Sequence, residues 1–232
     1  GSFAPLRDFP CSNKPQYLAF HPKNRDLLAV AGGDDHELTL WNLAEPKRPA
    51  SVIRSPGNAI WGAGLSEDGK RLGFRTARNP KATRPSLQAE GDWRVFDLAK
   101  GSFAPLGDDF RPVEPVLELD NPKWRVKPTK RPDLWVVVGP DGKEYPLEGK
   151  LLSLNYATRP TCYTFVPASP KRKGVPNRLA VGHNWGVSVY DLTDGGPVLV
   201  RSFAGHEGPT TCVAPSRDGD VLVTGSRDQT VI

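Results

Sequence analysis

The sequence has no methionine, no apolar run that approaches a membrane span and no signal peptide. A transmembrane helix needs about 20 mostly apolar residues, and a signal peptide needs a basic start followed by an apolar stretch. We therefore expect no membrane insertion. The absence of methionine, with Gly1-Ser2 at the start, predicts that the native protein begins earlier.

Cysteine is also scarce, with only Cys11, Cys162 and Cys212. They are widely spaced, odd in number and form no CxxC pair, so the sequence favours neither a zinc site nor a disulfide framework. The chain has neither GxGxxG nor GxxxxGK[ST], the glycine-rich phosphate loops. We expect no metal, no cofactor and a reducing compartment, hence a cytoplasmic location.

What the sequence does have is turn residues, with 23 glycines and 24 prolines among 232 residues. Hydrophobic residues make up 38% and charged residues 25%, which is ordinary for a folded chain. Short strand-like runs lie between the turns, and this pattern predicts an all-β fold. Repeated units can fill such a length as one architecture.

A repeating unit is clearest in residues 17–43 and 211–232. Each has a short apolar strand, a turn bearing Asp or Asn, a second apolar strand, a small-residue turn with Asp, and a third strand. Weaker copies occupy residues 59–98 and 162–192, and a degenerate copy occupies residues 124–147. Three short strands joined by such turns predict an antiparallel meander.

The pattern resembles the WD40 family, because aromatic-Asp/Asn-Leu endings occur three times: Trp41-Asn42-Leu43, Phe96-Asp97-Leu98 and Tyr190-Asp191-Leu192. The Gly-His pair of that family appears as Gly205-His206, followed at the expected distance by Asp228. The resemblance implies a β-propeller of about five blades in a partial or open ring. The expected units are residues 1–43, 44–98, 99–149, 150–192 and 193–232. Similar arrays occur in large bacterial proteins, so we expect a bacterial type.

The resemblance also implies roles for particular residues. His206 and Asp228 would fix a turn by hydrogen bonding and would not form half of a catalytic pair. Cys212 stands where the family usually has Ser or Thr, which would weaken that hydrogen-bond network. The residues expected to have structural roles of the WD type are Trp41, Asn42, Phe96, Asp97, Tyr190, Asp191, His206 and Asp228.

The two chain ends predict an incomplete array. Residues 1–6 and 101–106 are identical, and the second copy follows a blade ending. The chain stops at Ile232, so we expect the fifth unit to lack its outer strand and the open blade edges to allow self-association. The competing outcome is a five-unit ring in which Thr230–Ile232 pairs near the N-terminus.

Basic residues gather in loops that the repeat pattern assigns to one face, although the whole chain carries only +5. Such a face would attract an acidic protein partner, but lysine and arginine also favour loops generally. The candidate partner-binding residues are Lys23, Arg25, Lys47, Arg48, Lys127, Lys130, Arg131, Lys171, Arg172 and Lys173.

By resemblance, the expected function is a non-catalytic scaffold for protein–protein interaction. One alternative is a propeller-type hydrolase or lyase, but no convergent cluster of carboxylates and histidines is visible in the sequence. Another is a nucleic-acid binder, for which the net charge is too small and which would show steep salt dependence. Of the six tryptophans, Trp61 and Trp185 are the first to examine for exposure. The polar insert 76–91 predicts a long surface loop.

Overall fold

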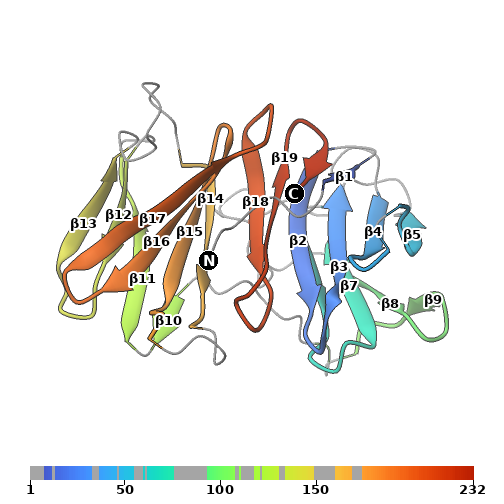
Figure 1. The fold of residues 1–232 in the computed structure, drawn as a ribbon. Coiled ribbons are helices and arrows are strands. Elements are labelled where there is room, and N and C mark those ends of the chain that lie inside the picture. The colour runs from blue at the N-terminus through green and yellow to red at the C-terminus, as the bar shows by residue number, and fades with distance from the viewer. Residues whose placement is uncertain are drawn as a thin grey trace. The chain divides into compact units, whose positions relative to one another are not determined.

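The computed structural model describes residues 8–11, 14–32, 37–45, 47–54, 60, 62–75, 93–107, 110, 118–120, 122–130, 134–148, 160–168 and 174–232. Every regular element within these ranges is a β-strand (Figure 1). The strands form five four-stranded antiparallel sheets. The predicted all-β fold class, with about five blades, is confirmed. No helix in the described ranges is long and apolar enough to cross a membrane.

The chain divides into two compact units, and each contains two complete sheets. The first unit comprises residues 1–114 and 225–232. Its first sheet is β2 (Pro15–His21), β3 (Asn24–Gly32), β4 (Glu37–Asn42) and β5 (Ser51–Arg54). Its second sheet is β6 (Gly62–Leu65), β7 (Arg71–Arg75), β8 (Trp93–Asp97) and β9 (Ser102–Ala104).

The second unit comprises residues 115–224. The third sheet is β10 (Glu118–Asp120), β11 (Lys123–Pro128), β12 (Leu134–Val138) and β13 (Glu144–Glu148). The fourth sheet is β14 (Cys162–Val166), β15 (Arg178–His183), β16 (Gly186–Thr193) and β17 (Gly196–Ala204). In all four of these sheets the strands follow chain order, as expected for consecutive meanders.

The fifth sheet differs because its strands come from both ends of the chain. Its order is β18 (Thr210–Pro215), β19 (Leu222–Ser226), β20 (Thr230–Val231) and then β1 (Phe9–Pro10). Phe9 pairs with Val231, and the Cys11 N–H donates to the Gln229 carbonyl oxygen over 2.8 Å. The prediction that the fifth unit lacks an outer strand is therefore wrong, because the N-terminal strand supplies it.

Burial of apolar side chains explains why β1 pairs there. Phe9 is buried, and its ring centroid lies 5.3 Å from that of Trp41 on β4. Burying a phenylalanine side chain stabilises a fold by about 1.5–3 kcal/mol, which compensates for the shortness of a two-residue strand. The repeated segment Gly1–Leu6 lies outside the described residues.

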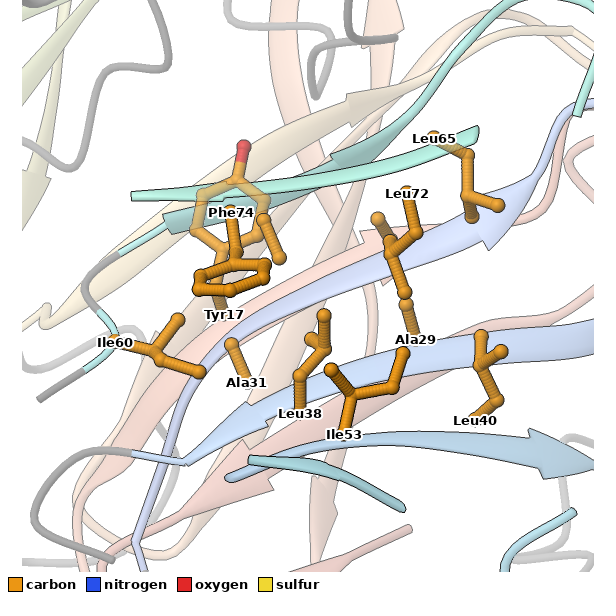
Figure 2. Close-up of a cluster of buried hydrophobic side chains, with 12 residues drawn as sticks. Tyr17, Ala29, Ala31, Leu38, Leu40, Ile53, Ile60, Leu65, Leu72 and Phe74 are labelled. Carbon is orange, nitrogen blue, oxygen red and sulfur yellow. The ribbon is translucent and has the colours of Figure 1, made fainter. Parts of the chain in front are cut away.

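Apolar side chains from the sheets of each unit form its core. In the first unit, Figure 2 shows Leu38 and Ile53 of the first sheet facing Leu72 and Phe74 of the second. Leu38, Leu72 and Phe74 have no exposed surface. In the second unit, a similar cluster joins the third and fourth sheets and includes Val137 and Phe165. Each sheet thus buries an apolar face that it could not bury alone.

The sheet boundaries show how the sequence units map onto the structure. The expected unit 44–98 holds β5, the outer strand of the first sheet, followed by three strands of the second. The third sheet opens with Glu118–Asp120, a strand that the sequence pattern did not reveal. The segment at Trp124 is consequently a second strand and not a first. The insert 76–91 lies outside the described residues.

Candidate functional site

His206 lies in the connection between β17 and β18, and its imidazole is buried. Its Nε2 shares a 2.8 Å hydrogen bond with the Thr224 hydroxyl on β19. Its backbone N–H donates over 3.2 Å to the carbonyl oxygen of Trp185, in the turn between β15 and β16. His206 therefore connects a strand of the fifth sheet with a turn of the fourth.

Asp228 lies in the turn between β19 and β20 and organises that turn. Its carboxylate accepts hydrogen bonds from the Thr230 N–H over 2.9 Å and from the Thr230 hydroxyl over 2.7 Å. Its own N–H donates to the Ser226 hydroxyl. Gln229, next in the turn, has a φ of 69°, the left-handed conformation that tight turns require. These bonds fix the start of β20, which β1 then pairs.

The hydrogen-bond partner of His206 was not predicted from the sequence. The Ser or Thr of the network was expected at position 212, but the structure has Thr224 in that role. Cys212 is buried on β18, where its sulfur lies 3.7 Å from the Thr211 hydroxyl. Thr224 lies within β19, and a hydroxyl inside a strand gives no sequence signal of such a role.

Removal of the His206 imidazole should destabilise the fold without removing a chemical activity. In His206→Ala, the buried Thr224 hydroxyl loses this hydrogen bond, and we expect a loss of roughly 1–3 kcal/mol in unfolding free energy. Urea denaturation followed by tryptophan fluorescence measures this loss. A variant that unfolds like the parent but loses a hydrolase or lyase activity would contradict the structural role.

The aromatic-Asp/Asn endings lie at the ends of third strands, where their polar side chains hold turns or strands. Asn42 Oδ1 accepts the Ala44 N–H over 3.0 Å. Asp97 Oδ1 accepts the Lys100 N–H over 2.9 Å, and that bond is the largest cause of its lowered pKa. Asp191 forms a 2.7 Å ion pair with Arg178 on the neighbouring β15. Each contact joins residues of one sheet or of the turn that follows it, and each has a structural role.

The aromatic members of these endings have different environments. Trp41 is buried, and its indole N–H donates to the Thr39 hydroxyl over 3.0 Å. Tyr190 is buried, and burial raises the pKa of its phenol to about 12. Phe96 is partly buried and packs edge-on against Phe103, with ring centroids 5.4 Å apart. These contacts place the aromatic rings in the packing of the sheets.

Basic side chains are exposed on turns of the first unit. Lys23 follows β2, Lys47 and Arg48 lie between β4 and β5, and Lys70 lies between β6 and β7. All four are exposed. Arg25, another candidate, is exposed at the start of β3. In an antiparallel sheet, turns between the first and second strands and between the third and fourth strands lie at the same end.

His21 connects the turns that carry Lys23 and Lys70. Its Nδ1 accepts the Lys23 N–H over 3.1 Å, and its Nε2 lies 3.1 Å from the Gly69 carbonyl oxygen. A neutral imidazole with its proton on Nε2 satisfies both hydrogen bonds. The backbones of the two lysine-bearing turns are therefore fixed relative to each other.

The Lys70 turn is itself held by a hydrogen-bond pattern that recurs in the fifth sheet. The Ser66 hydroxyl donates to Asp68 over 2.5 Å, and Asp68 accepts the Lys70 N–H over 3.0 Å. The bond from Ser66 is the main reason why the pKa of Asp68 is lowered. Ser216 and Asp218 make the corresponding bond over 2.6 Å. The Ser-x-Asp-Gly sequence thus forms a defined turn in both places.

The other basic candidates do not share this placement. Lys127 and Lys130 adjoin the connection between β11 and β12, second and third strands of their sheet. That connection lies at the opposite end of a sheet from a first-to-second turn, so its assignment to the same face is wrong. Lys127 also forms a 2.8 Å ion pair with Glu144. Arg131, Lys171, Arg172 and Lys173 lie outside the described residues.

Trp185 is 43% exposed and lies at the turn between β15 and β16. Trp61 lies outside the described residues. The described ranges contain no group of three or more His, Cys, Asp or Glu side chains that could hold a metal ion.

Comparisons with known proteins agree with this architecture. The family described as "WD domain, G-beta repeat" matches residues 197–232, a span that includes β18, β19 and β20. Angio-associated migratory cell protein from Homo sapiens is 26% identical over 220 residues, covering 91% of this chain and 43% of that protein. The protein of the same name from Canis lupus familiaris is also 26% identical, with 91% and 42% covered.

The chain thus spans less than half the length of the curated relatives that it matches. The repeat match includes three of the four strands of the fifth sheet, β18, β19 and β20, and contains Gly205-His206 and Asp228. The other four sheets repeat the same four-stranded antiparallel meander. The chain therefore contains a WD40 repeat within residues 197–232, and its five four-stranded sheets are of the β-propeller type.

Proposed function

We propose that this chain is a non-catalytic scaffold for protein–protein interaction and that the basic turns of its first unit bind an acidic segment of a partner. WD40 repeats generally mediate contacts between proteins, which supports the general role. The specific partner class is inferred from the turns at Lys23, Lys47, Arg48 and Lys70. Free thiols at all three cysteines support a reducing, cytoplasmic setting.

The observation that carries the proposal is the rigid presentation of exposed lysines. His21 fixes the backbone of Lys23 to that of Gly69, and the Ser66–Asp68 bond fixes the backbone of Lys70. A surface whose backbone is already ordered loses less conformational entropy when a partner binds. Charged groups on such a surface accelerate encounter with an oppositely charged partner and help to select it.

The alternatives predict different behaviour. A nucleic-acid binder would bind duplex DNA with a steep salt dependence, whereas an acidic-peptide site prefers carboxylates arranged on a flexible chain. An enzyme would need convergent reactive groups, and the WD-type residues His206 and Asp228 instead make the turn contacts described above.

Val198 and Val200 are exposed on the outer strand β17, which favours self-association as a second mode of interaction.

Charge reversal on the fixed turns should weaken binding of an acidic peptide. We expect the double variant Lys23→Glu/Lys70→Glu to bind a fluorescein-labelled peptide of four Glu-Gly repeats about tenfold or more weakly at low salt, since each reversal replaces attraction by repulsion. Fluorescence anisotropy measures the affinity. Both side chains are exposed, so the fold should be retained.

A control is Lys143→Glu, which reverses one exposed lysine on the turn between β12 and β13, outside the proposed site. It should leave the affinity within about twofold of the parent, because a single exposed charge outside the contact contributes little to affinity. Sedimentation velocity on each variant separates peptide binding from self-association. Equal losses in control and double variant, or tighter binding of duplex DNA than of the acidic peptide, would refute the proposed site.

A further inference from the structure

Trp185 is an exposed tryptophan on a turn that carries no basic residue. It is 43% exposed, whereas Trp41 and Trp124 are buried. Large aromatic side chains usually gain stability by burial, and exposed tryptophans with fixed backbones are common binding hot spots. The exposed indole is therefore available for contact with a partner protein.

The turn that holds Trp185 is well ordered by hydrogen bonds. The Trp185 N–H donates to His183 Nδ1 over 3.3 Å. Its carbonyl oxygen accepts the N–H groups of Gly205 and His206, over 3.1 and 3.2 Å. The Thr210 hydroxyl donates to the Gly186 carbonyl oxygen over 2.8 Å. The backbone that carries the indole is thus hydrogen-bonded on both sides, so little conformational entropy is lost when a partner binds.

The stretch of chain that holds this turn carries more acidic than basic side chains. Residues 179–216 contain Asp191, Asp194 and Glu207 but no lysine and one arginine, Arg201. Glu207 is exposed and directly follows His206, whose N–H donates a hydrogen bond to the Trp185 carbonyl oxygen. The Arg201 guanidinium lies 5.2 Å from the centroid of the Phe203 ring, so it already has an aromatic partner on its own strand. No basic side chain of this stretch competes for Trp185.

We propose that Trp185 and Glu207 form a binding site for an arginine or lysine side chain of a protein partner. The face of an indole attracts a cation within about 6 Å of the ring, and a nearby carboxylate adds a charge-assisted hydrogen bond. The site lies in the second unit and is distinct from the basic turns of the first. The inference rests on the proposed scaffold function and adds a second, oppositely selective surface to it.

The test uses a fluorescein-labelled peptide of four Arg-Gly repeats, with affinity measured by anisotropy. Trp185→Ala should weaken binding roughly tenfold, and Trp185→Phe should recover part of the loss because phenylalanine keeps a weaker π face. Glu207→Gln should weaken binding about threefold and flatten the salt dependence. The matched control is Asp194→Asn, which removes one exposed negative charge from the turn between β16 and β17.

Melting curves by circular dichroism show whether each variant is folded. If Trp185→Ala does not fold, the test relies on Glu207→Gln, which changes an exposed side chain. The proposal is overturned if Glu207→Gln and Asp194→Asn weaken binding equally, or if folded Trp185→Ala binds like the parent. The Glu-Gly peptide is measured in parallel. If it binds while the Arg-Gly peptide does not, this site alone is wrong; if neither binds the parent, the proposed function fails as well.

Discussion

Replacing Gly219 by alanine should destabilise the protein far more than the same change at Gly142. Both glycines follow an aspartate in a tight turn, with φ of 66° and 79°. In both turns the glycine N–H donates to the carbonyl oxygen three residues earlier, over 2.9 and 3.0 Å. The left-handed backbone disfavours alanine at either position by about 1–2 kcal/mol.

The two glycines differ in what a Cβ atom would meet. At Gly219 it would lie 2.5 Å from the carbonyl oxygen of Pro167, which follows β14. At Gly142 nothing lies within 4 Å. Because the neighbour at Gly219 is backbone, it cannot rotate away, and forced overpacking adds about 1–3 kcal/mol. We therefore expect a loss of roughly 2–5 kcal/mol for Gly219→Ala and about 1–2 kcal/mol for Gly142→Ala.

Urea denaturation of the two variants and the parent measures the difference. Gly69→Ala offers an intermediate case, because its Cβ would overlap the His21 imidazole, and a side chain can move. That movement would break the bond from His21 to the Gly69 carbonyl oxygen. Equal destabilisation by Gly219→Ala and Gly142→Ala would show that the Ser-x-Asp-Gly turn of the fifth sheet does not pack against the fourth.

Stability should fall as the pH drops from about 6.5 towards 4, because His183 is held neutral. It is buried at the end of β15, and its Nδ1 accepts the Trp185 N–H. Its Nε2 is buried and has no hydrogen-bond partner in the described part of the chain. Burial lowers the pKa of His183 from 6.5 to about 4, with a smaller contribution from the nearby His206.

The sign follows from which state takes up the proton. Between pH 6.5 and 4 the unfolded chain binds a proton at residue 183 and the folded chain does not, so falling pH favours unfolding. The shift corresponds to roughly 3 kcal/mol, fully present above pH 6.5 and lost as the pH falls through 4. Asp68 and Asp97, whose pKa values are lowered from 3.8, lose their contribution only below that range.

Unfolding free energies of the parent and of His183→Gln, measured from pH 7 to 4.5, test this effect. Glutamine has a similar reach but does not titrate, so the variant should start less stable and lose less on acidification. If the unfolding free energies of parent and variant fall in parallel with pH, then His183 is not the cause of the loss of stability in acid.

Much of the fold was predictable from the sequence, because each repeat is marked by apolar alternation and turn residues that lie close together in the chain. The segments ending in Trp41-Asn42, Phe96-Asp97 and Tyr190-Asp191 were found from alternating apolar residues and turn chemistry, and they lie on β4, β8 and β16. The short strand Glu118–Asp120 was missed because three residues carry too little periodicity. The partnership of β1 with β20 joins residues more than 200 positions apart, which no local pattern reveals.

The candidate sites were predictable only in part. The lysines at positions 23 and 70 could be assigned to turns, but the role of His21 depends on a bond to Gly69, 48 residues away. The assignment of Lys127 and Lys130 failed because missing β10 shifted the strand count of the third sheet by one. Thr224 was overlooked because a hydroxyl on a strand carries no signal until its histidine partner is located.

We propose that this chain presents two protein-binding surfaces of opposite charge preference. Backbone amide chemical shifts of the ¹⁵N-labelled chain, recorded with the Glu-Gly peptide and then with the Arg-Gly peptide, locate both surfaces in one experiment. We expect the acidic peptide to shift the amides around Lys23 and Lys70, and the basic peptide to shift those around Trp185 and Glu207. Shifts at the same residues with both peptides, or at neither pair, would contradict it.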